Sequence, residues 1–79
     1  MFSEAAAARL VAASRAEQRK VAAILDGIKA APGRPGDLQE WDAQGRKNEV
    51  LVVDDWIVTF WPDDAVREVR IVRLERVED

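Results

Sequence analysis

The stretch AAPGRPG, residues 30–36, divides the chain into two halves with different backbone preferences. Two prolines and two glycines within seven residues end any helix that reaches them, because proline lacks an amide donor and glycine favours non-helical backbone. Alanine, the strongest helix former, is abundant before this break, and β-branched and aromatic residues dominate after residue 47. The order predicts one α+β domain over residues 1–79, with helices first and strands second.

Two helices are predicted ahead of the break, over residues 4–13 and 15–30. Ser3 can cap the first helix. Ser14 followed by Glu17 is a capping box, which separates the two helices and starts the second. Apolar residues at spacing i, i+3, i+4, i+7 give the second helix one stripe that we expect to pack on a sheet. These residues are Val21, Ile24, Leu25 and Ile28.

Three strands are predicted after the break, over residues 48–53, 56–61 and 66–76. Asp54-Asp55 separates the first two as a hairpin turn, and Pro-Asp-Asp at 62–64 is expected to form the next turn. Residues 32–47 are predicted to form a loop, which Leu38 and Trp41 would pin to the core. The expected architecture is a helical hairpin packed on one face of a three-stranded antiparallel meander.

The closing stretch AVREVRIVRLERVED carries an arginine at every third position, namely Arg67, Arg70, Arg73 and Arg76. A helical winding would leave no face apolar, so we interpret the stretch as a strand. Its apolar alternation changes phase near residues 71–72, which indicates a bulge or burial on both sides. A regular strand would place Arg67 and Arg73 on one face and Arg70 and Arg76 on the other, paired with carboxylates rather than gathered into one basic patch.

The second face of the sheet is expected to need a cover. Both odd and even positions of EVLVV and WIVTFW are apolar, whereas a sheet open to water on one side should alternate. We therefore predict a partner-binding surface, and the simplest cover is either a second copy of the chain, as a two-fold dimer through the sheet, or a different polypeptide. The residues assigned to this surface are Val50, Val52, Trp56, Val58, Phe60 and Trp61.

Composition excludes several classes of site. The chain has no cysteine and no histidine, and we expect no metal site and no cofactor. The carboxylate pairs at 54–55 and 63–64 are explained by turn chemistry. No run of about 20 apolar residues is present, so we expect no membrane span and a cytoplasmic location. The net charge of −3 argues against direct binding of nucleic acid.

The order and spacing of these elements resemble the RelE/ParE superfamily of toxins from bacterial toxin–antitoxin systems. FSEAAAARL is similar to the family's opening helix, and SRAEQRKVAAILDGIKAAPGRPGD to its second helix and the break after it. GRKNEVLVVDDWIVTFWPDDAVREVRIVRL is similar to its three final strands and their turns. The resemblance covers almost the whole chain.

Two departures from the family pattern bear on function. The family begins with a strand ahead of the first helix, and only Met1 and Phe2 precede Ser3 here, which would leave a sheet edge open to strand addition. The ribonuclease members place an aromatic–arginine pair after the Asp-Asp turn, where this chain has Trp56-Ile57, and often use a tyrosine or histidine that this chain lacks. We therefore expect no cleavage of mRNA on ribosomes.

Charged residues that could still serve a ribonuclease are Arg46, Lys47, Arg70 and Arg73. They are weak catalytic candidates, because nothing in the sequence supplies a base. The resemblance instead implies a ParE-like toxin that binds DNA gyrase and is neutralised by an antitoxin protein. The alternative is a non-toxic module that uses the same scaffold for protein interaction or homo-oligomers. A ribosome-dependent endoribonuclease ranks third.

Overall fold

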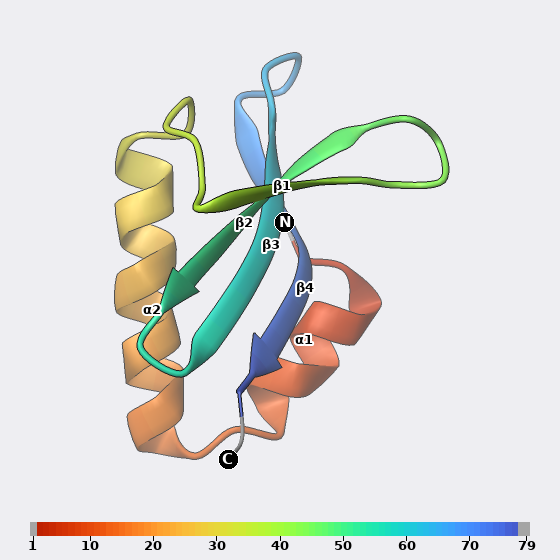
Figure 1. The fold of residues 1–79 in the computed structure, drawn as a ribbon. Coiled ribbons are helices and arrows are strands. Elements are labelled where there is room, and N and C mark those ends of the chain that lie inside the picture. Colours follow the sequence, from red (N-terminus) through yellow and green to blue (C-terminus); the bar gives the residue numbers. More distant parts are fainter. Residues whose placement is uncertain (1, 78–79) are drawn as a thin grey trace.

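The computed structural model describes residues 2–77, which form two helices followed by a four-stranded antiparallel sheet of strand order β1-β2-β3-β4 (Figure 1). The α+β class and the helices-first order are as predicted. The elements are α1 (Glu4–Val11), α2 (Arg15–Ala30), β1 (Leu38–Trp41), β2 (Lys47–Val53), β3 (Trp56–Asp63) and β4 (Glu68–Arg76).

Side-chain caps fix where both helices begin, as the sequence predicted. The Ser3 hydroxyl accepts a hydrogen bond from the Ala6 amide at 3.1 Å. At α2 the Ser14 hydroxyl accepts from the Glu17 amide at 3.2 Å, and the Glu17 carboxylate accepts from the Ser14 amide at 2.9 Å. This reciprocal pair satisfies two amides that the first turn leaves without helical partners.

The predicted loop over residues 32–47 is wrong in its middle, where β1 pairs with β2 and makes the sheet four-stranded instead of three-stranded. Asp42 builds the hairpin turn, because its carboxylate accepts from the Arg46 amide at 2.8 Å, and Gly45 supplies the positive φ of 79°. Leu38 and Trp41 are 61% and 68% exposed, so neither pins the segment to the core. Short strands with polar residues give little alternation to detect, and this explains the error.

The second predicted turn lies further along the chain than residues 62–64. β3 continues through Pro62 to Asp63, and the turn follows at residues 64–67, where Arg67 takes a φ of 53°. Pro62 is tolerated in the strand because Phe60 is the last residue of β3 that pairs with β2. The missing amide therefore removes no bond of the β2–β3 ladder.

A bulge in β4 confirms the expected phase change near residues 71–72. Phe60 pairs with Ile71 and its neighbour Thr59 pairs with Arg73, so Val72 is the extra residue. The bulge restores alternation on each side of it, and Val69, Ile71 and Leu74 are all buried on one face.

The same bulge overturns the predicted split of the arginines. Arg70 pairs with Trp61 and Arg73 with Thr59, which places both on the face opposite the core. Arg76 lies on the core side, and Arg67 lies in the turn. The prediction assumed a regular strand and was therefore wrong in placing Arg70 and Arg73 on opposite faces.

Both helices pack on one face of the sheet. The apolar stripe of α2 is buried or partly buried there, as predicted, and α1 lies against β4. Within residues 2–77 no helix is long and apolar enough to cross a membrane. The buried core consists of Ala6, Val21, Leu25, Ile28, Trp56, Val58, Phe60, Val69, Ile71 and Leu74.

Replacing Leu25 by alanine should lower the free energy of unfolding by about 2–5 kcal/mol, because the side chain is only 7% exposed and its removal leaves a cavity. Val11→Ala is the control, since Val11 is 79% exposed and should change stability by less than about 0.5 kcal/mol. Urea unfolding followed by circular dichroism measures both. Equal losses in the two variants would contradict the assigned core.

Acid should weaken the fold partly through Glu49, which is 8% exposed on the core side of β2. Hydrogen bonds from the Gln39 side chain and the Gly36 amide, both at 2.9 Å, outweigh burial and lower the pKa of the Glu49 carboxyl. A lowered folded pKa contributes stability above the unfolded pKa of about 4.3 and loses that contribution as the pH falls through the folded value.

Glu49→Gln keeps an oxygen that can accept these hydrogen bonds but removes the titration. The variant should therefore lose less stability than the wild type between pH 6 and pH 3, in urea melts at fixed ionic strength. Wild-type and variant curves that fall in parallel would show that Glu49 does not contribute to the acid transition.

Candidate functional site

The face of the sheet opposite the helices is the candidate functional site, and we refer to it as the helix-free face. Strand pairing places alternate residues of all four strands on it. Its members are Leu38, Glu40, Asn48, Val50, Val52, Ile57, Thr59, Trp61, Asp63, Glu68, Arg70, Arg73 and Glu75.

One half of the helix-free face, towards the β2–β3 hairpin, is apolar. Val52 pairs directly with Ile57, and Val50 pairs with both Leu38 and Thr59. Val52 is 45% exposed, and Val50 and Ile57 are half-buried. An apolar cluster of this kind at the centre of a sheet is typical of a surface that another polypeptide covers.

Three residues assigned to the partner surface lie elsewhere. Trp56, Val58 and Phe60 are at most 2% exposed, because their side of β3 faces the helices. They belong to the core and cannot contact a partner. Of the predicted set, Val50, Val52 and Trp61 remain on the helix-free face.

An ion pair between β1 and β4 spans the middle of the helix-free face. The Arg73 guanidinium donates to both carboxylate oxygens of Glu40, at 2.6 and 2.7 Å, although β1 and β4 are the outermost strands. In a flat sheet three strand spacings would separate them by roughly 14 Å. The twist turns β1 across the direction of β3 and β4 and makes this contact attainable (Figure 1).

Glu40 raises the pKa of Arg73 above its ordinary value, so this guanidinium stays charged. It also contacts Glu75 at 3.1 Å. A cation paired with two carboxylates is poorly suited to bind substrate phosphate. Sequence reasoning missed Glu40 because it missed β1.

Two polar side chains are buried on the helix-free face beside this ion pair. Asn48 is 2% exposed and Thr59 is 1% exposed. Within residues 2–77 the Asn48 side-chain oxygen and the Thr59 hydroxyl have no hydrogen-bond partner. Most buried polar atoms are paired, so these two carry an uncompensated desolvation cost.

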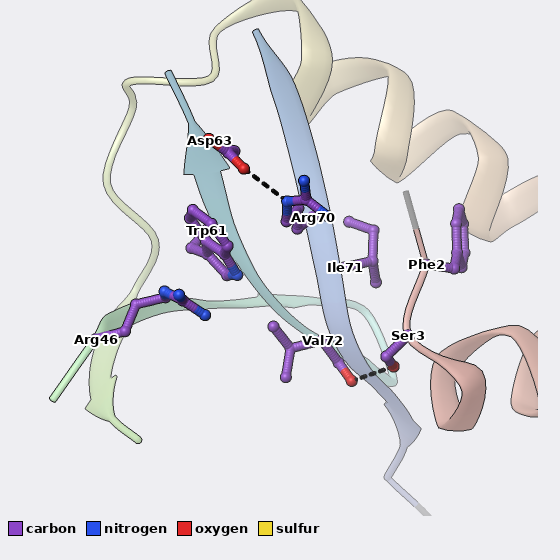
Figure 2. Close-up of a pocket in the computed structure, with 8 residues that line it drawn as sticks. All are labelled: Phe2, Ser3, Arg46, Trp61, Asp63, Arg70, Ile71 and Val72. Carbon is purple, nitrogen blue, oxygen red and sulfur yellow. Dashed lines mark hydrogen bonds and ion pairs between the residues drawn. The ribbon is translucent and has the colours of Figure 1, made fainter. Parts of the chain in front are cut away.

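The other half of the face holds a cleft of about 450 Å³ around Trp61, which we call the Trp61 cleft (Figure 2). Its lining residues are Phe2, Ser3, Arg46, Trp61, Asp63, Arg70, Ile71 and Val72.

Trp61 lies between two guanidinium groups in this cleft. Arg46 stacks on the indole ring at 4.0 Å from its centroid, and Arg70 approaches the ring at 5.6 Å. The Arg70 Nε–H donates to Asp63 at 2.8 Å, which holds Arg70 in place (Figure 2). Cation–π contacts of this kind orient arginine side chains that would otherwise be mobile.

The four weak catalytic candidates do not form one cluster. Arg46 and Arg70 meet at Trp61, whereas Arg73 is held by Glu40. Lys47 pairs with Trp41 on the core side of the sheet and contacts Glu49 at 3.8 Å. The arrangement provides positive charge but brings no base to it.

The edge of the sheet beside the Trp61 cleft is partly occupied by the start of the chain. Phe2 forms a parallel bridge with Ile71, and the Ser3 amide donates to the Ile71 carbonyl at 2.8 Å. The Ser3 hydroxyl donates to the Val72 carbonyl at 2.6 Å (Figure 2). The predicted open edge is therefore covered at these two residues of β4.

A second cavity of about 530 Å³ lies between α2 and β2. It is lined by apolar residues that include Ile24, Leu51 and Val53, and Gly27 faces open space in α2.

Within residues 2–77 no group of three or more acidic side chains is placed to hold a metal ion. The described residues therefore contain no cluster of side chains that points to a metal site.

No model of a known protein family matches this chain, and neither a characterised protein nor a solved structure matches it.

Replacing Thr59 by valine should raise the free energy of unfolding by about 1 kcal/mol, because it removes a buried hydroxyl that has no partner and keeps the side-chain shape. Urea unfolding measures the change. A loss of stability similar to that of a broken hydrogen bond would show that the hydroxyl is satisfied in solution.

Proposed function

We propose that this protein is a toxin-like component of a bacterial toxin–antitoxin module, which acts in the cytoplasm by binding a protein and is neutralised by an antitoxin. The observation that carries the proposal is the apolar half of the helix-free face. Val52 and Ile57 face each other across β2 and β3, and Val52 is 45% exposed. The family assignment within this proposal rests on the resemblance of the sequence to the RelE/ParE superfamily.

The position of Ile57 favours protein binding over RNA cleavage. The ribonuclease members would place an arginine here, where cleavage requires positive charge to stabilise the developing phosphorane. In this chain the position lies beside Val52 in the apolar half of the face. The sequence also has no histidine or tyrosine to act as base.

DNA gyrase is the target that the ParE branch of the family implies. An antitoxin segment that covered Val50, Val52 and Ile57 would compete directly with a target that uses the same residues. It would also remove their apolar surface from water, which supplies a driving force of about 25 cal/mol for each Å² buried.

The same exposed surface favours one alternative, a non-toxic scaffold in which a second copy of the chain covers the face. A two-fold dimer would place equivalent valines against each other. Sedimentation equilibrium of the isolated chain at micromolar concentration distinguishes this alternative from a monomeric toxin.

Val52→Asp should abolish the growth arrest that we expect on induction of the wild-type chain in a bacterial host, because a carboxylate in the apolar half would have to be desolvated on binding. Val66→Asp is the matched control, since Val66 is 54% exposed in the β3–β4 turn and receives the same change of charge. Growth curves and a gyrase supercoiling assay with purified protein provide the readouts.

Each result assigns a function. Arrest by the wild type and Val66→Asp but not by Val52→Asp supports the proposal, and gyrase inhibition identifies the target. Arrest by all three proteins would remove the apolar half from the mechanism. No arrest, with a dimer that Val52→Asp dissociates, would establish the interaction module instead. Codon-positioned mRNA cuts in primer extension would establish a ribonuclease.

A further inference from the structure

Arg46 offers hydrogen-bond donors that no carboxylate in the described part of the chain uses. Its guanidinium stacks on Trp61 at 4.0 Å, and within residues 2–77 it has no ion pair. The nearby Asp42 carboxylate is engaged in the hairpin turn, where it accepts from the amides of Gln44 and Arg46. The side chain is thus held by the ring while its charged edge remains available.

The structure around Trp61 limits how far this guanidinium can move. Arg70 approaches the same ring at 5.6 Å and is anchored by Asp63 at 2.8 Å. Trp61 is half-buried between strands, so the stack has a rigid base. A guanidinium that is already oriented loses less conformational entropy when it binds an anion.

We propose that the Trp61 cleft binds a carboxylate side chain of an extended peptide segment, whose neighbouring apolar side chains cover Val50 and Val52. This inference rests on the proposed function in one respect, namely that the partner is a protein. Arg46 would form a bidentate pair with the carboxylate, which is the geometry that guanidinium groups favour. Val72 gives the cleft an apolar wall that accommodates the methylenes of a glutamate.

Charge complementarity favours a single carboxylate over a nucleic acid. The cleft contains two arginines and one aspartate, so it has a surplus of one positive charge. The chain as a whole carries −3, and Glu40, Glu75 and Glu68 lie on the same sheet. The negative charge around the cleft would repel a polyanion such as RNA or DNA. It would have much less effect on a single carboxylate flanked by apolar residues.

The two halves of the helix-free face together specify a pattern for the partner. The apolar half presents Val50 and Val52 on β2, and the Trp61 cleft lies towards the opposite end of β3. Because successive side chains of an extended chain point to opposite faces, a segment with apolar residues at positions i and i+2 and an acidic residue at i+4 would direct all three onto the helix-free face. Antitoxin or target segments of this composition are the expected ligands.

The test uses the purified full chain and the peptide acetyl-Val-Ser-Val-Ser-Glu-amide, whose two valines and glutamate share one face when it is extended, with acetyl-Val-Ser-Val-Ser-Gln-amide as the uncharged counterpart. Binding is followed by the Trp61 indole N–H signal in ¹H–¹⁵N spectra, which Trp61→Phe assigns by its loss. We expect the glutamate peptide to shift this signal, and the glutamine peptide to bind at least tenfold more weakly. Added salt should weaken the glutamate peptide's affinity.

Arg46→Ala should reduce the affinity for the glutamate peptide at least tenfold. Arg19→Ala is the matched control, since Arg19 is exposed on α2, on the other side of the sheet, and its loss removes the same charge. Unchanged ¹H–¹⁵N spectra outside the cleft would show that each variant keeps its fold.

Three results would overturn the inference. They are equal binding of the two peptides, no shift at millimolar peptide, and tighter binding of a ten-residue oligothymidylate than of the glutamate peptide, which would assign the cleft to nucleic acid. None of them depends on toxicity. Growth arrest that Val52→Asp relieves and Arg46→Ala leaves intact would retain the proposed function and reject the carboxylate site.

Discussion

The extra residue Val72 in β4 determines which side chains of this small domain are buried. Without it, Ile71 and Leu74 would point to opposite faces, and the core would lose one of them to solvent. With it, both lie under the helices together with Val69. A domain of 79 residues has little core to spare, so this register is a condition for folding as well as a local irregularity.

The same register sets the electrostatics of the helix-free face. By bringing Arg70 and Arg73 to one side, the bulge allows one to reach Asp63 beside Trp61 and the other to reach Glu40 on β1. These pairs are partly exposed and contribute little to stability. Their effect is on specificity, because they neutralise most of the positive charge and leave Arg46 as a localised site in an otherwise acidic surface.

The face thus combines two different surfaces, an apolar half around Val52 and Ile57 and a cleft that contains the Arg46 guanidinium. Interfaces commonly gain affinity from the first and discrimination from the second. The buried oxygens of Asn48 and Thr59, which have no hydrogen-bond partner within residues 2–77, lie between the two halves and carry a desolvation cost.

The sequence by itself determined the class of the fold, both helix starts and the place where the apolar phase of the last strand changes, because each depends on residues close together in the chain. The capping box, the Pro/Gly break and the change of apolar phase are local signals of this kind. Only the tertiary structure decided that β1 exists, that Trp56, Val58 and Phe60 belong to the core, and that Arg46, Trp61 and Arg70 meet. Both parities of β3 are apolar, so its pattern alone could not say which side the helices cover. That choice depends on contacts between segments distant in sequence, which strand register and sheet twist bring together.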